Sequence, residues 1–140
     1  MAIAKRLLKD TATIFVPLGE DANGSMEYES YIFRQVSCQV GAGMTINGGQ
    51  NPADTLELYV FDTSSTVTRN GGEIDVATAC EHIFHVVRDA PTDIDVAEKM
   101  YILPYASNDV APPSMSRRVS SAIRRAAGAR RIWHWEVHGK

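Results

Sequence analysis

Short segments in which apolar and polar residues alternate recur along this chain, and they constrain its fold more than any other feature. The clearest is 56–61, where leucine and valine alternate with glutamate and aromatic residues. An alternation of period two places every second side chain on one face of a β-strand. Segment 28–40 alternates as well, 11–16 is rich in β-branched and aromatic residues, and 101–103 is a short apolar run; glycine or proline closes each of the three. We therefore expect a mainly β fold, a small antiparallel barrel or sandwich with long loops and little helix.

Breaks in the alternation predict where strands end or bend. Pro17 follows the first run and predicts its end, because proline has no backbone N–H to donate. Within 28–40 the apolar residues change face near Arg34 and Gln35, which predicts a β-bulge in one long strand or two short strands. The polar segment 63–72 ends in Asn-Gly-Gly and is expected to be a loop.

Helix is expected in only a small part of the chain. Apolar residues of 76–87 lie at helical spacing, although the last of them also fit a strand. We expect a short helix or turn that runs into a strand near 82–88, and one further helical turn within 93–99. Long loops are expected at 41–52, which is rich in glycine and asparagine, and at 107–115, which contains two adjacent prolines.

The carboxy-terminal region predicts an antiparallel hairpin over about 117–138, with its turn marked by Gly128. The residues expected to share one face of its first strand are Val119, Ser121 and Ile123. On its second strand Trp133, Trp135 and Val137 are expected to share one face. The two tryptophans are candidate anchors of the core or of a contact between subunits.

Length and composition favour one structural domain over residues 1–140. With 44% hydrophobic and 22% charged residues, a chain of 140 residues can bury a core without disulfide bonds. No apolar run approaches the ~20 residues that span a bilayer, and the start of the chain has no apolar stretch typical of a secretory leader. We therefore expect no membrane partner and synthesis in the cytoplasm. There Cys38 and Cys80 are expected to be reduced and buried.

Charge is divided unevenly along the chain. Before Arg117 there are 7 lysines and arginines against 16 acids, a net charge of −9; from Arg117 to Lys140 there are 7 against one acid, Glu136, a net charge of +6. The arginines of this end form three doublets and are candidates for contacts between subunits or with phosphate: Arg117, Arg118, Arg124, Arg125, Arg130 and Arg131. Arginine pairs with carboxylates and phosphates through two hydrogen bonds. Opposite patches favour head-to-tail contact between copies or a basic rim facing phosphate, and two merely solvated surfaces are the alternative.

One cluster of potential metal ligands, Cys80, His82 and His85, lies within six residues. Structural zinc sites use four ligands, usually as two spaced pairs, and the other cysteine, Cys38, is distant in the sequence. On a strand, His82 and His85 point to opposite faces. We therefore expect histidines of the core or of an edge and no metal site. A small metal-binding protein or enzyme that uses these three residues is the alternative from another class.

Motifs for catalysis are incomplete. His134 and His138 flank a glutamate, but the metalloprotease motif requires a helix, and on a strand the two histidines lie ~13 Å apart. No Gly-x-Ser-x-Gly nucleophile elbow is present, and no Gly-Lys-Ser/Thr follows the glycines of 41–49. We expect no catalytic residues and no cofactor, so the chain is not predicted to be an enzyme. No aromatic ladder accompanies the arginines, and sequence-specific DNA recognition is therefore not expected.

The two ends of the chain resemble one protein family. Trp133–Lys140, with the sequence Trp-His-Trp-Glu-Val-His-Gly-Lys, resembles the closing motif of small minor capsid proteins encoded in the head and tail gene clusters of tailed phages. Leu8–Ile14, with the sequence Leu-Lys-Asp-Thr-Ala-Thr-Ile, is similar to the opening strand of the same proteins. The resemblance does not extend to the middle of the chain, 41–116.

The resemblance implies a structural protein of the virion, a head-to-tail connector of the stopper, adaptor or head-completion type. Such subunits form rings, here expected to hold six or twelve copies, between portal and tail around the DNA channel. The implied partners are the portal or adaptor protein, the tail terminator or tail tube, and packaged DNA through non-specific contacts. The implied location is the virion neck, after synthesis in the host cytoplasm. A tail terminator or tail-tube protein and a host-directed binding protein are alternatives.

Overall fold

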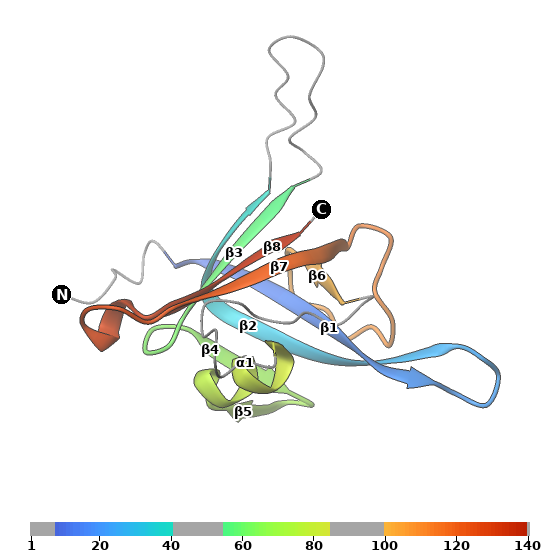
Figure 1. Ribbon diagram of the computed structural model, residues 1–140. Coiled ribbons are helices and arrows are strands. Elements are labelled where there is room, and N and C mark those ends of the chain that lie inside the picture. The colour runs from blue at the N-terminus through green and yellow to red at the C-terminus, as the bar shows by residue number, and fades with distance from the viewer. Residues whose placement is uncertain (1–7, 41–54, 85–99, 140) are drawn as a thin grey trace, which may run out of the picture.

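The computed structural model describes residues 8–40, 55–84 and 100–139 of the chain (Figure 1). The strands are β1 (Asp10–Glu20), β2 (Met26–Val40), β3 (Leu56–Phe61), β4 (Thr66–Arg69), β5 (Gly72–Ile74), β6 (Tyr101–Leu103), β7 (Arg117–Arg125) and β8 (His134–Gly139). The helices are α1 (Val76–Phe84) and one 3₁₀ turn, η3 (Arg130–Ile132). The mainly β prediction is confirmed. The predicted loops at 41–52 and the helical turn at 93–99 lie outside the described residues.

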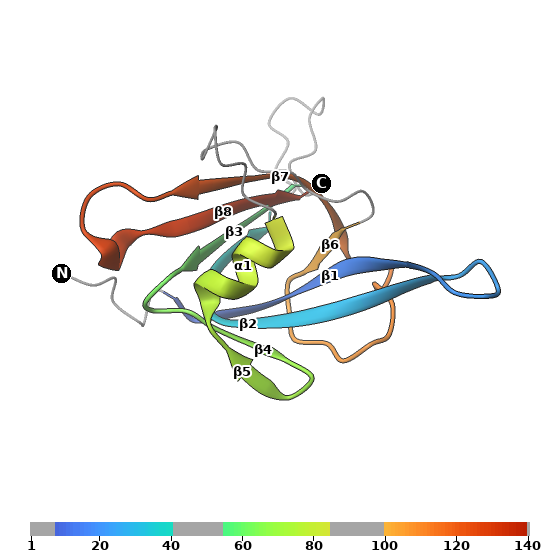
Figure 2. The same cartoon turned by 60° about the horizontal axis from the view of Figure 1, so that its bottom comes forward.

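The strands form one antiparallel sheet that closes on itself (Figure 2). Its order is β1-β6-β7-β8-β3-β2, and β1 also pairs with β2, which completes a ring of hydrogen-bonded strands. The short hairpin of β4 and β5 continues from the edge of β2 that also carries β3. Of the two expected architectures the structure is therefore the barrel, in which each of these six strands is paired on both edges over part of its length.

The long strand β2 bends at Gln35, as the change of alternation predicts. Its register to β1 shifts between Thr11, opposite Arg34, and Asp10, opposite Val36. Gln35 is therefore the extra residue, and its φ of +55° is the left-handed conformation found in bulges. The bulge lets Phe33 and Val36 both enter the core although they are an odd number of positions apart.

The prediction that Pro17 ends the first strand is wrong. β1 continues to Glu20, with Pro17 opposite Tyr28. The described strand β6 pairs with β1 only at residues 13–15, so Pro17 interrupts no ladder on that edge. Leu18 is the extra residue of a second register shift between Pro17 and Gly19, and its side chain is exposed.

The prediction of a loop over 63–72 is also wrong in part, because β4 lies within it and β5 begins at its end. Asn70 and Gly71 have φ of +53° and +81° and form the tight two-residue turn between them. The preceding corner is held by Ser65, whose hydroxyl accepts from the N–H of Phe61 at 2.9 Å and donates to the carbonyl of Gln35 at 2.7 Å. These long-range contacts, and not local hydrophobicity, select the strands here.

The helix predicted in the middle of the chain is confirmed over Val76–Phe84. Asp75 caps it by accepting from the backbone N–H and the hydroxyl of Thr78, both at 3.0 Å. The predicted strand near 82–88 is wrong at its start, since 82–84 are helical, and its remainder lies outside the described residues. The buried face of α1 belongs to the core of the barrel, and Phe84 packs on Trp135 with ring centroids 5.5 Å apart.

The closing hairpin of β7 and β8 also forms as predicted, but its first strand has a bulge that the sequence analysis missed. Gly139 lies opposite Val119 and His138 opposite Ser121, so Ser120 is the extra residue. The bulge changes the face of every later residue, and Val119 and Ala122 are the buried ones in place of the expected set. By the same alternation Arg124 turns toward the inside of the protein.

Candidate functional site

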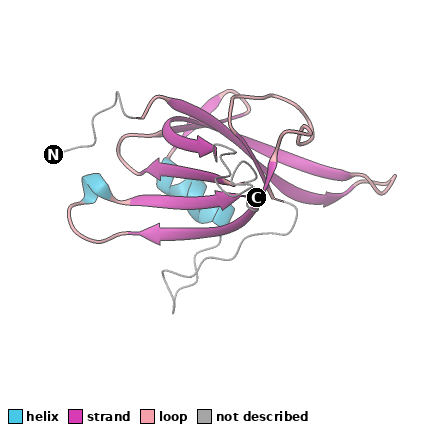
Figure 3. Cartoon of the chain, turned by 90° about the horizontal axis from the view of Figure 1, so that it is seen from above, coloured by secondary structure: helices cyan, strands magenta, loops and turns pink. Residues whose placement is uncertain are grey.

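The basic hairpin of β7 and β8 contains the candidate residues that the sequence singles out. β8 lies between two partners, because it pairs with β7 on one edge and with β3 on the other. Residues 126–133 connect the two strands through Gly128, with φ of +76°, and the turn η3. The strands are thus fixed in the barrel wall, while the connection lies at its outer end (Figure 3).

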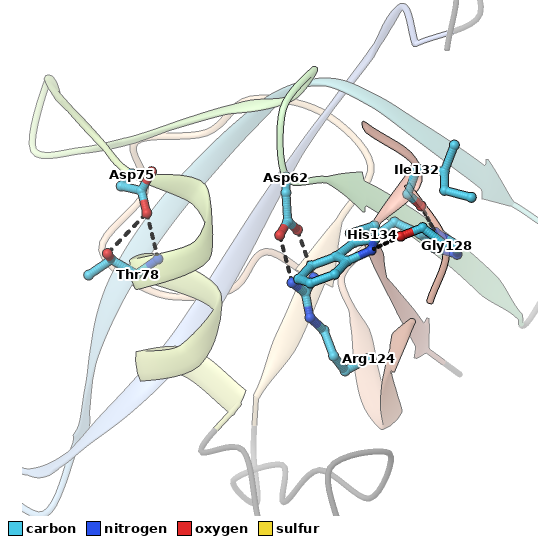
Figure 4. A network of polar contacts seen from close by, with 8 residues as sticks. Asp62, Asp75, Thr78, Arg124, Gly128, Ile132 and His134 are labelled. Carbon is cyan, nitrogen blue, oxygen red and sulfur yellow. Dashed lines mark hydrogen bonds and ion pairs between the residues drawn. The ribbon is translucent and has the colours of Figure 1, made fainter. Parts of the chain in front are cut away.

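Arg124 is held inside the protein by a buried ion pair (Figure 4). Its Nη1 and Nη2 donate to the two carboxylate oxygens of Asp62 at 2.7 and 2.6 Å, and the two side chains are 14% and 2% exposed. The guanidinium also lies 4.7 Å from the ring centroid of Trp135 and 5.6 Å from that of Trp133. Such a bidentate pair fixes both side chains. The expectation that Arg124 contacts a partner or DNA is therefore wrong, because the fold occupies its guanidinium.

Arg125 points to the outer face of the hairpin, where it shares Glu136 with His134. Glu136 accepts from Arg125 Nε at 3.0 Å, and His134 Nε2 lies 3.0 Å from the same carboxylate oxygen. Partial burial opposes ionisation of Glu136, but the hydrogen bonds from His134 and Arg125 outweigh it and lower the pKa of Glu136. His134 Nδ1 lies 2.9 Å from the carbonyl of Ile132, so only the imidazolium can donate from both nitrogens.

The other four candidate arginines divide into two groups. Arg117 is half-buried beside Gly139 and donates to the carbonyl of Met115 at 3.3 Å. Arg118, Arg130 and Arg131 are exposed and make no ion pair within the part of the chain that the structure describes. Arg130 and Arg131 lie together in η3, at the outer end of the hairpin. With Arg125 they place three exposed arginines at that end, whereas Arg118 lies opposite Tyr101 at the start of β7.

The two tryptophans have different positions. Trp135 is 1% exposed and is the largest fully buried side chain of the described residues, so it anchors the core. Trp133 precedes β8 and is half-buried, and its Nε1 donates to the carbonyl of Gly128 at 3.1 Å. Trp133 has an extended backbone, and its ring and that of Trp135 lie beside the same Arg124 guanidinium, but of the expected set only Trp135 and Val137 are buried. Trp133 packs against the connection between β7 and β8, and the guanidinium of Arg130 lies 5.8 Å from the centroid of its ring.

The structure separates the potential metal ligands of the middle segment. Cys80 is completely buried in the core, and His82 lies on the exposed side of α1, two positions away along the helix. Burial, with the nearby charge of Asp62, raises the pKa of the Cys80 thiol and keeps it protonated. His85 lies outside the described residues. Within those residues no group of three or more His, Cys, Asp or Glu side chains could hold a metal ion.

Cys38 is also unsuited to thiolate chemistry. Partial burial, with the charge of Asp10, raises its pKa to about 12. The carboxylate of Asp10 accepts from the backbone N–H of Cys38 at 2.9 Å, which ties the start of β1 to the end of β2.

Two open hollows lie on the surface, one of them beside the Asp62 that binds Arg124. One, of about 310 Å³, is lined by Asp62, Thr66, Glu73 and Asp75 among others. The second, of about 510 Å³, lies between the β1–β2 pair and the loop before β7, and its lining includes Tyr28, Tyr101, Pro112 and Pro113. The first lining combines carboxylates with the hydroxyls of Ser65 and Thr66, and the second consists largely of tyrosine, proline and serine side chains.

The sequence analysis missed Asp62 as the partner of Arg124. The only local signal is that Asp62 directly follows the apolar strand 56–61, where an acid at a strand end is ordinarily solvated. The bulge at Ser120, which turns Arg124 inward, leaves no mark in the sequence that separates it from plain alternation.

Comparisons with known proteins add no relative. No protein-family model, curated protein or solved structure matches this chain. Among the described residues, none of the helices has the length and apolar character needed to span a membrane.

Proposed function

We propose that this protein is a structural subunit of a tailed-phage virion, a head-to-tail connector of the stopper or adaptor type and not an enzyme. The observation that carries the proposal is the resemblance of both ends, Leu8–Ile14 and Trp133–Lys140, to small minor capsid proteins of tailed phages. In the fold residues 10–14 lie in β1 and residues 134–139 lie in β8, two strands of the barrel wall. Under this proposal the two motifs stabilise the barrel of each subunit.

Two features of the described residues support an assembly role. Burial raises the pKa of the thiols of Cys38 and Cys80, which disfavours thiolate chemistry at both cysteines. Exposed arginines gather at one end of the molecule, as a ring subunit needs for contact with a neighbour or with the phosphates of DNA in a channel. We propose a ring of six or twelve copies in the virion neck, between the portal or adaptor protein and the tail terminator or tail tube.

The test is the location and copy number of the chain in purified particles. Quantitative mass spectrometry against the portal protein and labelling of the chain in electron micrographs are expected to show six or twelve copies at the neck. Copies along the tail tube or at the tail tip of the same ring size assign the chain to the tail-tube or tail-terminator class instead. Absence from particles contradicts a virion role and favours a host-directed binding protein.

A further inference from the structure

The outer half of the β1–β2 pair is a ribbon without a third strand. β6 pairs with β1 only at residues 13–15, and β4 pairs with β2 only at 32–34, so residues 17–29 pair with no other described strand. A two-stranded ribbon is marginally stable in water by itself and leaves both of its edges unpaired. We name residues 17–29 the acidic arm.

The arm has one sign of charge. Residues 10–33 include five acids and not one lysine, arginine or histidine. Asp21 shapes the turn by accepting from the backbone N–H groups of Asn23 and Ser25 at 2.8 and 3.0 Å. Glu20 and Glu27 are exposed and make no ion pair within the described part of the chain. Beside them Leu18 is 60% exposed, which adds an apolar side chain to a negative surface.

The far end of the β7–β8 hairpin has the opposite composition. We name residues 125–133 the basic tip; they include three arginines and no acid. Arg130 and Arg131 are exposed, and Ile132 beside them is 41% exposed. Trp133 holds this turn in shape through its bond to Gly128 and its contact with the guanidinium of Arg130. The basic tip is thus an ordered positive surface with one apolar side chain.

The acidic arm and the basic tip lie at opposite ends of the molecule. Figures 1, 2 and 3 each place the turn between β1 and β2 at one end and the turn η3 at the other, with the barrel between them. The two surfaces therefore cannot meet within one chain. They can meet only between chains, and then each copy offers one arm and one tip, which is a head-to-tail contact.

We infer that the acidic arm of one copy docks on the basic tip of the next copy. Glu20 and Glu27 face Arg130 and Arg131 across this contact, and Leu18 packs against Ile132. Within one chain the arm packs on the barrel through Tyr28 and Tyr101, and the contact gives its outer end a partner and removes two exposed apolar side chains from water. It rests on the proposed ring, and it names the two surfaces that close the ring. Charges of this kind are screened over ~10 Å at 0.1 M salt, so association weakens as salt is added.

The experiment reverses each charged surface separately in the full chain. The arm variant carries Glu20→Lys and Glu27→Lys, and the tip variant carries Arg130→Glu and Arg131→Glu. Native mass spectrometry and sedimentation velocity in low salt measure assembly. Wild type is expected to form closed oligomers of more than two copies, and each variant alone is expected to associate at least tenfold more weakly. An equal mixture of the two variants is expected to assemble again, because positive arms meet negative tips and negative arms meet positive tips.

Matched controls carry the same change of charge elsewhere. Glu73→Lys with Glu81→Lys copies the arm variant on β5 and α1, and Lys9→Glu with Arg34→Glu copies the tip variant just before β1 and on β2. All four residues are exposed. The controls are expected to assemble like wild type. Circular dichroism and thermal unfolding establish that every variant is folded before its assembly is compared.

Four outcomes overturn the inference. They are a wild type that stays monomeric at the highest attainable concentration, a wild type that stops at a two-fold dimer, reversal variants that assemble like wild type, and a mixture that does not recover. A tip variant that loses binding to short duplex DNA and keeps its self-association assigns the tip to nucleic acid instead. Failure of the proposed function gives a different result. If the chain assembles through arm and tip but is absent from particles, this inference stands and the proposed location in the virion neck is contradicted.

Discussion

The β1–β2 pair and the β7–β8 pair are two antiparallel hairpins of one sheet with opposite designs. Residues 10–33 hold five acids and no base, while 117–139 hold six arginines and one acid. In the basic hairpin the charge near the barrel is neutralised internally, by Asp62 on Arg124 and by Glu136 on Arg125. In the acidic arm Glu20 and Glu27 make no such pair among the described residues.

Two hairpins with charged residues can therefore have different roles: in one the charge is paired inside the protein, and in the other it stays exposed to water. The basic hairpin carries Trp135 into the core, and its strand β8 lies between β7 and β3, so its charge must be satisfied before it can be buried. The outer arm contributes no side chain of comparable size to the core, so its charge can remain exposed to water. Substitutions in the two hairpins should therefore separate effects on stability from effects on assembly.

The largest expected effect is that of Trp135→Ala in the basic hairpin. The indole is 1% exposed and packs on Phe84 and under the guanidinium of Arg124, so its loss leaves a large cavity. We expect the free energy of unfolding to fall by about 3–5 kcal/mol, measured by urea unfolding. Trp133→Ala, which changes a half-buried ring, is expected to lose on the order of 1 kcal/mol. Equal losses at the two positions contradict the conclusion that Trp135 belongs to the core and Trp133 to the surface of the hairpin connection.

The next effect is that of Asp62→Ala, which leaves the guanidinium of Arg124 buried without its counter-ion. We expect a loss of about 3 kcal/mol in the free energy of unfolding. Arg125→Ala is the control, because its ion pair with Glu136 is half exposed and is worth at most about 1 kcal/mol. Replacing both partners, Asp62→Leu with Arg124→Met, is expected to recover most of the loss. A double variant as unstable as the single one shows that the pair has a role beyond charge compensation.

A smaller effect is the dependence of stability on pH through Glu136. Its pKa is lower in the folded protein than its ordinary value of 4.5, so the folded state favours the ionised form. The resulting stabilisation is present above the ordinary pKa and is lost as pH falls through the folded pKa. Unfolding curves of wild type and Glu136→Gln are therefore expected to converge on acidification. His134→Gln and Arg125→Gln, which remove the two donors, should each shrink the difference; an unchanged pH profile in both argues against this cause.

The smallest effect on stability is expected in the acidic arm. Glu20→Gln with Glu27→Gln removes two exposed charges that have no partner in the described part of the chain, so the free energy of unfolding should change by less than about 0.5 kcal/mol. Association of copies should nevertheless weaken, as measured by sedimentation at low salt. A loss of stability above about 1 kcal/mol removes the contrast between the two hairpins.

The local spacing of apolar residues was sufficient to predict the elements whose apolar side chains face the core. The alternation of 56–61, the change of face at Gln35, the helical spacing from Val76 and the closing hairpin all correspond to elements of the structure. The local pattern was misleading where pairing with a distant segment determines whether a strand forms. Pro17 is tolerated because no third strand is hydrogen-bonded there, and β4 forms in a polar segment because Ser65 ties its corner to β2.

Alternation and charge are properties of neighbouring residues, so the sequence was sufficient to predict antiparallel strands and a basic carboxy-terminal region opposite in charge to the rest of the chain. Which charged side chains stay exposed to water depends on the tertiary structure. Arg124 finds its partner 62 residues away in the chain, and a bulge at Ser120 turns it inward. Barrel closure then sets the acidic arm and the basic tip at opposite ends. Such placements depend on contacts between distant segments, which no local pattern contains.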